Sequence, residues 1–130
     1  MSGESLLVEI RSFIDQHIGD ADLSPAVVAA AHYVSVRTLY RLFAMDGCTV
    51  AQWIKGRRLR LCRQDLADSN LAHLSIPAVA ARRGFQNAHH FSRLFREVFG
   101  MSPRAYRVQV RASSPTAVGV QSKDCAGVPS

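Results

Sequence analysis

The chain has 130 residues, of which 48% are hydrophobic, and its formal net charge is +6. This length suits one domain with a modest core. The sequence excludes a membrane-spanning protein, because no apolar run approaches the roughly 18 residues of a membrane helix; it also begins without a signal-peptide pattern, so we expect a cytoplasmic protein.

The charge is distributed unevenly along the chain. Residues 1–34 carry one basic and five acidic side chains, residues 35–111 carry fourteen basic and four acidic ones, and residues 112–130 are balanced. Thirteen of those fourteen basic residues are Arg, whose planar donor fork suits phosphates and guanine edges. This favours nucleic acid as a partner, with a merely solvated basic surface as the alternative.

The cysteines and the remaining chemistry give no sign of a reaction. Cys48, Cys62 and Cys125 lie far apart and lack a suitably spaced pair of histidines, so we expect reduced thiols and no metal. Paired carboxylates beside a nucleophile and a Gly-rich phosphate loop are also missing. We therefore expect neither a cofactor nor an enzyme; an enzyme that uses His89, His90 or a cysteine is the rival interpretation.

The first half of the chain predicts three helices. Apolar spacing indicates a helix over about 4–18, and the pair Ser24-Pro25 then supplies an N-cap and a first-turn proline for a second. Ser35 caps a third helix that reaches about Met45.

A long helix is predicted over about 49–68. Thr49 and Gln52 form a capping-box pattern at its start. At 100° per residue it has two apolar faces rather than one, and these comprise Val50, Trp53, Ile54 and Leu61 on one side and Leu59, Cys62 and Leu66 on the other. A helix with two apolar faces packs against two lobes, as a connector does. The alternative is a helix at the centre of one larger core.

Three further helices follow. Ser75-Ile76-Pro77 opens a fifth helix that ends near Gly84, and Asn87 caps a sixth that ends near Phe99. Ser102-Pro103 repeats the N-cap and proline device for a seventh helix, to about Val110. From residue 112 the chain lacks aromatic residues and periodicity, which predicts a disordered tail.

Two segments repeat one design. Residues 29–43 and 80–95 each read as a short Ala-rich helix, a turn and a second helix, and both end in Arg-Leu-Phe. The second helices carry matched polar stripes at i, i+3, i+4 and i+7, which consist of Arg37, Tyr40, Arg41 and Ala44 in one and His89, Ser92, Arg93 and Arg96 in the other. Two such stripes suggest two DNA-reading elements.

The most specific pattern lies between residues 84 and 107. It comprises Gly84-Phe85, Phe91, Arg93, Phe95-Arg96, Phe99-Gly100, Ser102-Pro103 and Tyr106-Arg107, and the first half adds Leu39, Arg41, Phe43, Trp53-Ile54, Arg57 and Leu66. Over about residues 6–108 the chain resembles the DNA-binding domain of the AraC/XylS family of bacterial transcription regulators.

That resemblance implies an all-α fold of seven helices, in which two homeodomain-like helix-turn-helix subdomains are joined by a long connector helix. The expected boundaries are 1–48 for the first subdomain, 49–68 for the connector, 69–111 for the second subdomain and 112–130 for the tail. The repeat and the two-faced helix suggest the same organisation independently.

The resemblance also implies which residues contact DNA. The residues expected at base edges are Val36, Arg37, Tyr40, Arg41, Ala88, His89, Ser92 and Arg93. Helix starts and basic side chains suggest the phosphate contacts, which are Ser35, Arg82, Arg83, Asn87, Arg96, Ser102 and Arg104.

Each of these assignments has a structural alternative. Arg41 and Arg93 could instead form buried ion pairs, the histidine pair at 89–90 could only cap its helix, and Tyr40 could only cover its own helix. For Arg57, which lies on an apolar face of the connector, a structural pair with a carboxylate is expected rather than a DNA contact.

The chain departs from the family pattern in three ways. Tyr33 stands where the family often has Gly, and because a left-handed conformation strains Tyr, we expect this turn to differ in geometry. Arg63 replaces a residue that is usually small, which puts the packing there in doubt. An effector-binding or dimerisation domain is missing, so the chain is either a stand-alone member or an excised domain, and its tail favours excision.

The sequence therefore predicts sequence-specific binding of double-stranded DNA for transcription regulation, with two recognition helices in successive major-groove segments. The resemblance implies activation and RNA polymerase as a further partner. The alternatives are a basic protein-interaction module and a fragment that binds DNA without specificity.

Overall fold

The computed structural model describes residues 3–112, and this part of the chain is all helical. Its α-helices are α1 (Gly3–Gln16), α2 (Pro25–Ala31), α3 (Val36–Ala44), α4 (Val50–Ala67), α5 (Ile76–Arg82), α6 (Ala88–Phe99) and α7 (Pro103–Ala112). A short 3-10 turn at Ser69–Leu71, which the sequence did not predict, follows α4. The all-α fold of seven helices is confirmed. Ala112 still belongs to α7, and the rest of the predicted tail lies outside the described residues.

The helices begin where the sequence places their caps. The side chains of Ser24, Ser35 and Asn87 each accept a hydrogen bond from a backbone amide of the first turn that follows. At the start of α4, Thr49 Oγ1 accepts from the Gln52 amide and Gln52 Oε1 accepts from the Thr49 amide, both at 3.0 Å. Local hydrogen bonding therefore explains most of the helix boundaries.

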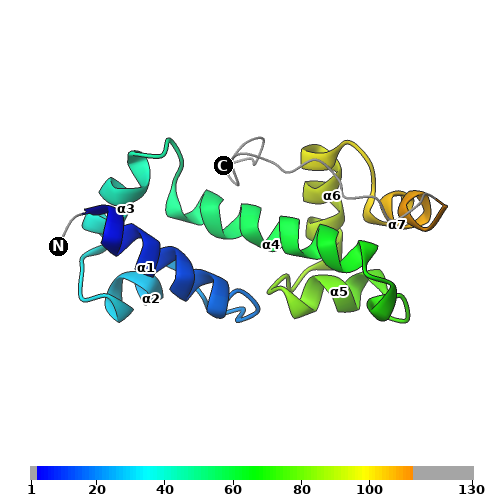
Figure 1. The fold of residues 1–130 in the computed structure, drawn as a ribbon, viewed down its shortest axis with the longest axis horizontal. Helices are drawn as coiled ribbons and strands as arrows, with labels where there is room; N and C mark the ends of the chain where they lie inside the picture. The colour runs from blue at the N-terminus through cyan, green and yellow to red at the C-terminus, as the bar shows by residue number, and fades with distance from the viewer. Residues whose placement is uncertain (1–2, 113–130) are drawn as a thin grey trace.

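Two hydrophobic clusters share α4, which spans the molecule with α1–α3 at one end and α5–α7 at the other (Figure 1). Val50 and Ile54 are buried in the first cluster, whereas Leu59, Cys62 and Leu66 are buried in the second. The two predicted apolar faces of this helix thus meet different partners. This supports a connector between two lobes rather than one larger core; the exact subdomain boundaries stay a prediction.

The two helix-turn-helix turns share a left-handed residue and the same hydrogen bonds, so the expectation of a different turn at Tyr33 is wrong. Tyr33 has φ 56° and Gly84, its counterpart, has φ 94°. The amide of Val34 donates to the carbonyl of Ala29 at 3.1 Å, and the matching residues of the second unit make the same bond at 3.1 Å. Tyr33 keeps the backbone strain of a left-handed residue, while its side chain, at 97% exposure, adds no clash with the rest of the protein.

Two arginines of α4 have structural partners. Arg57 Nε donates to Asp15 Oδ1 of α1 at 2.9 Å, which confirms the expected pair with a carboxylate. The guanidinium of Arg63 lies 4.6 Å from the ring centroid of Phe99, so this large residue is accommodated by a cation–π contact with the end of α6.

Two of the cysteines lie in the described residues, and both are buried. Cys62 is a free thiol in the second cluster, as the sequence predicts, and burial raises its pKa to about 12. Cys48 is buried in the first cluster. Cys125 lies outside the described residues.

Candidate nucleic-acid interface

The exposed face of α3 carries three of its four predicted base-contacting residues. Arg37, Tyr40 and Arg41 are exposed, and Val36 is half-buried at the first position of the helix. The other face places Leu39 in the first cluster with no exposed surface. Packing therefore directs the polar stripe of α3 towards solvent. The Tyr40 side chain is 46% exposed, so part of its surface is available to a partner.

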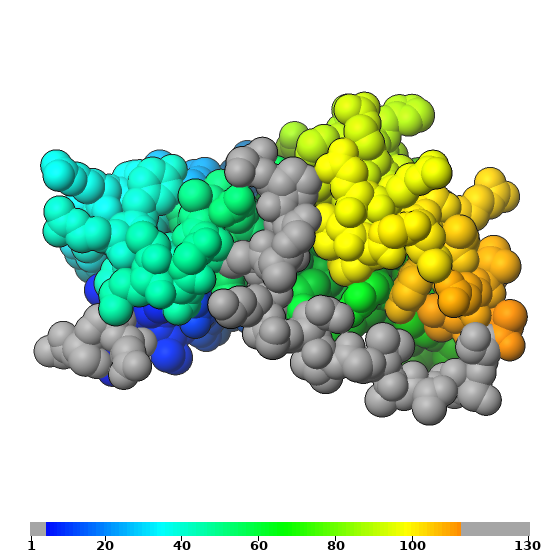
Figure 2. Space-filling view, turned by 90° about the horizontal axis from the view of Figure 1, so that it is seen from above, coloured from blue at the N-terminus to red at the C-terminus, as the bar shows by residue number. Residues whose placement is uncertain are grey.

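The exposed face of α6 matches that of α3. His89 and Arg93 are exposed, whereas Ala88 and Ser92 are half-buried. The cap of α6 is Asn87, whose Oδ1 accepts from the backbone amide of His90 at 3.0 Å, so capping does not occupy the His89 side chain. Figure 1 shows α3 and α6 near opposite ends of α4, and in the view from above both helices reach the visible face (Figure 2).

The arginines divide into two groups by their contacts. Within residues 3–112, no ion pair or side-chain hydrogen bond engages the exposed guanidinium groups of Arg37, Arg41, Arg93, Arg96 and Arg104. Four of these lie on α3 and α6, and the fifth lies in the first turn of α7. These arginines therefore keep their charges and hydrogen-bond donors available for a partner. The alternative of buried ion pairs for Arg41 and Arg93 finds no support.

Arg82 and Arg83, two predicted phosphate contacts, both lie beside the buried carboxylate of Asp65 on α4. Arg83 donates to both carboxylate oxygens, at 2.7 and 2.9 Å, and this bond raises the pKa of Arg83 above its usual value. The Nη1 of Arg82 lies farther away, at 3.6 Å, and its side chain is 44% exposed. Arg83 thus fastens α5 to α4, and Arg82 is the more available of the two.

The three predicted N-cap contacts already use their side chains within the protein. Ser35 Oγ accepts from the Thr38 amide at 3.0 Å, and Ser102 Oγ accepts from the Ala105 amide at 3.1 Å. Asn87 makes the equivalent bond in α6. An anion at these helix starts would therefore meet backbone amides and the positive end of the helix dipole first.

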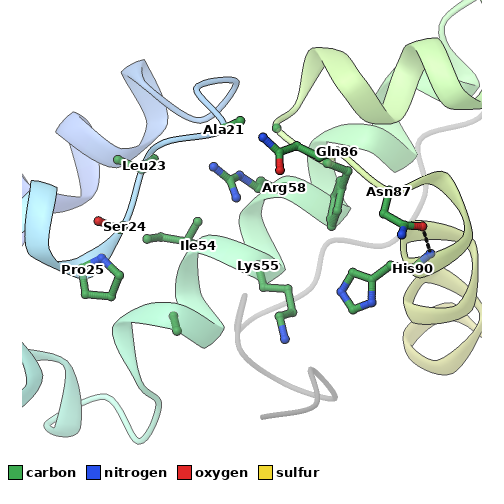
Figure 3. Close-up of a pocket in the computed structure, with 13 residues that line it drawn as sticks. Ala21, Leu23, Ser24, Pro25, Ile54, Lys55, Arg58, Gln86, Asn87 and His90 are labelled. Atoms are coloured by element: carbon green, nitrogen blue, oxygen red, sulfur yellow. Dashed lines mark hydrogen bonds between the residues drawn. The ribbon is translucent and has the colours of Figure 1, made fainter.

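The structure also places residues together that sequence reasoning missed. A cleft of about 400 Å³ between the two lobes is lined by Lys55 and Arg58 of α4 and by Gln86 and His90 beside the start of α6, as Figure 3 shows. Burial lowers the pKa of Arg58, an effect that the nearby carboxylate of Asp20 opposes. Little in the sequence pointed to this cleft, apart from Lys55, which is the sole lysine of the basic segment at residues 35–111.

Residues 3–112 form no helix that is long and apolar enough to cross a membrane. The same residues hold no group of three or more metal-ligating side chains.

Comparisons with known proteins place this geometry in a family. The family model described as a helix-turn-helix domain matches residues 28–109. A transcriptional regulator from Chromobacterium violaceum, with an AraC-type DNA-binding domain, has a crystal structure that aligns at a TM-score of 0.75 and 30% identity, over 82% of this chain and 93% of that one. The chain belongs to the AraC family of helix-turn-helix proteins.

Other AraC-type relatives agree with this assignment. The transcriptional activator NphR from Rhodococcus is 39% identical over 101 residues, which are 78% of this chain and 29% of NphR. The DNA-binding domain of AdpA, solved in complex with a target DNA, aligns at a TM-score of 0.75 and 29% identity, over 85% of this chain and 97% of that domain. The chain spans between 29% and 41% of the length of the curated relatives that it matches first.

Proposed function

We propose that this chain binds double-stranded DNA sequence-specifically and thereby regulates transcription. The observation that carries the proposal is a group of five exposed arginines on α3, α6 and α7 that have no ion-pair or hydrogen-bond partner within residues 3–112. An exposed arginine without a protein partner can release counterions from DNA or form a bidentate pair with guanine. Membership of the AraC family and the DNA complex of AdpA support the same conclusion.

In the proposed complex, α3 and α6 enter successive major-groove segments on one side of the duplex. The proposed base contacts are the eight residues expected from the sequence, of which five are exposed and three are half-buried. The proposed phosphate contacts are Arg82, Arg96 and Arg104 with the helix starts at Ser35, Asn87 and Ser102. Arg83 is left out of this set, because its donors are held by Asp65.

The connector α4 gives this docking a geometric consequence. If it holds the recognition helices about one helical turn of DNA apart, roughly 34 Å, both can dock on neighbouring major-groove segments. If the connector holds the helices at a distance that differs from the spacing of straight B-DNA, the DNA must bend or one helix must remain outside the groove.

The regulatory outcome that we propose is activation in the bacterial cytoplasm, with RNA polymerase as a protein partner. Its support is the description of NphR as a transcriptional activator. This chain covers a minor part of such relatives. We further propose that effector sensing and dimerisation are not functions of the helices in residues 3–112.

Selection from a random pool of DNA duplexes at near-physiological salt tests the proposed function. Two enriched boxes about 10–10.5 bp apart, centre to centre, would support docking of both helices. A single box would mean that one unit alone reads bases. Salt-sensitive binding without enrichment would overturn sequence-specific binding and favour a basic interaction module or a non-specific fragment.

A further inference from the structure

The two lobes approach each other through backbone at one place beside α4. A Cβ atom added to Gly19, just after α1, would lie 2.6 Å from the carbonyl oxygen of Arg82 in the second lobe. A Cβ atom added to Gly84, in the turn between α5 and α6, would lie 2.8 Å from the carbonyl oxygen of Ile18. Glycine at both positions therefore permits this close contact, because a side chain at either one would push the two lobes apart.

Arg58 of the connector holds the first lobe at this contact. Its Nε donates to the carbonyl of Ile18 at 3.0 Å and its Nη2 donates to the carbonyl of Asp20 at 2.7 Å. The added Cβ atom of Gly84 would also lie 2.6 Å from Arg58 Nε, so the guanidinium lies directly against the second lobe's turn. Figure 3 shows Arg58 between the loop labelled at Ala21 and the turn labelled at Gln86.

Beyond this contact the lobes are separated rather than packed. The cleft of about 400 Å³ lies between the start of α2, at Pro25, and the start of α6, at Asn87, with Lys55 of α4 between them. The main helix contacts stay within each lobe, and α4 is the element that both lobes share. The angle between the lobes thus depends on α4 and on the small contact around Arg58.

We propose that Arg58, with Gly19 and Gly84, is a positioning device that sets the distance and angle between α3 and α6, and so selects the spacing of the two DNA boxes. This inference rests on the proposed function. One added base pair moves a box by about 3.4 Å and turns it by roughly 35°, so a rigid pair of helices can engage one spacing well and its neighbours poorly.

The test measures the affinity of the full chain for duplexes that carry both selected boxes with spacers changed by −2 to +2 bp. We expect the wild-type chain to lose about tenfold in affinity for a change of one base pair, because the second helix can no longer dock. Arg58→Gln removes the charged fork, and we expect it to lower this loss to about threefold. Gly19→Ala wedges the lobes apart at an ordinary backbone conformation, and we expect it to shift the preferred spacer.

Two control variants separate positioning from stability. Arg57→Gln breaks the neighbouring pair with Asp15, which joins α4 to α1 of the first lobe. Because this pair does not involve Gly19, Gly84 or the carbonyls that Arg58 binds, the variant should keep the wild-type spacer preference. Gly47→Ala introduces backbone strain at φ +79° with no atom within 4 Å of the new Cβ, so it should lower stability without changing the spacer preference.

Each outcome decides a different claim. A wild-type chain that enriches no box overturns the proposed function, and with it the inference. A wild-type chain that enriches one box only, or binds all spacers equally well, overturns the inference alone. A wild-type chain with a sharp preference that folded Arg58→Gln and Gly19→Ala variants retain overturns the inference alone.

A second measurement works without DNA. Spin labels introduced as noncanonical amino acids at the exposed positions Met45 and Glu97 report the distance between the ends of α3 and α6. The inference requires a broader distance distribution in Arg58→Gln than in the wild-type chain and in Arg57→Gln. Equal widths in all three proteins would contradict it.

Discussion

Arginine serves two opposite purposes in this chain, and the contacts of each guanidinium distinguish them. Arg57, Arg58, Arg83 and Arg107 donate to carboxylates or carbonyls of other elements and so fasten helices together. The unpaired arginines on α3, α6 and α7 make no such bond within the described residues. An unpaired, hydrated charge adds little to folding but remains available to a nucleic acid.

Arg93→Ala should remove discrimination at one or two base pairs while binding stays salt-sensitive. A bidentate arginine–guanine pair contributes about 1–3 kcal/mol of discrimination, and its loss affects those positions alone. Affinities for the selected site and its single-base variants measure the effect. An unchanged preference at every position would show that Arg93 does not read bases.

Tyr33→Gly should stabilise the protein by about 0.5–1 kcal/mol. The left-handed conformation costs a non-glycine residue about 1–2 kcal/mol, which the greater freedom of glycine in the unfolded chain partly offsets. Urea unfolding of both proteins gives the difference. Tyr33→Ala is the control, since alanine keeps the backbone strain and removes only an exposed ring; equal gains from both changes would contradict this explanation.

The helix α4 connects the lobes because different residues of one continuous element belong to different clusters. Its first half contributes Val50 and Ile54 to the first cluster, and its second half contributes Leu59, Cys62 and Leu66 to the second. The same half also presents Asp65, whose side chain is buried beside α5. Apolar burial and the ion pairs of Asp65 with Arg82 and Arg83 therefore hold α5 against the connector.

Asp65→Asn should destabilise the protein by about 2–4 kcal/mol, because it leaves the partly buried Arg83 without its carboxylate partner. Thermal or denaturant unfolding measures the loss. Arg82→Ala is the matched control: its 3.6 Å contact is longer and its side chain more exposed, so the loss should stay below about 1 kcal/mol. Equal losses in both variants would contradict the assigned roles.

At the scale of the whole molecule, acidic and basic side chains are distributed unevenly along the chain. Residues 1–34 carry an acidic excess, whereas the segment from α3 to α7 carries a strong basic one. A basic surface of this kind attracts the phosphate backbone irrespective of sequence, and the affinity then falls as salt displaces the contacts.

Arg104→Ala should weaken binding about equally for all DNA sequences and lower the slope of log affinity against log salt by about one. Arg104 is exposed in the first turn of α7, which is not one of the two recognition helices. Titrations at several salt concentrations, with the selected site and with random DNA, measure both quantities. An effect confined to one base position would instead assign Arg104 to direct readout.

The seven helices, the repeated unit and the two faces of α4 could all be predicted from the order of residues. Caps and prolines act within one helical turn, and apolar periodicity acts along one helix. Both can therefore be recognised in the sequence. The exposed stripes of α3 and α6 followed from the same periodicity, and their exposure is now confirmed, while their DNA contacts stay predictions.

The tertiary structure decided which charged residues are already engaged. Arg58 meets the carbonyls of Ile18 and Asp20 from about forty residues away, and Asp65 meets Arg83 from the next helix. Such pairs depend on how helices pack, which residue spacing does not encode. The turn at Tyr33 was decided in the same way: the packing of its helices imposes a left-handed residue there, and the side chain accepts the strain.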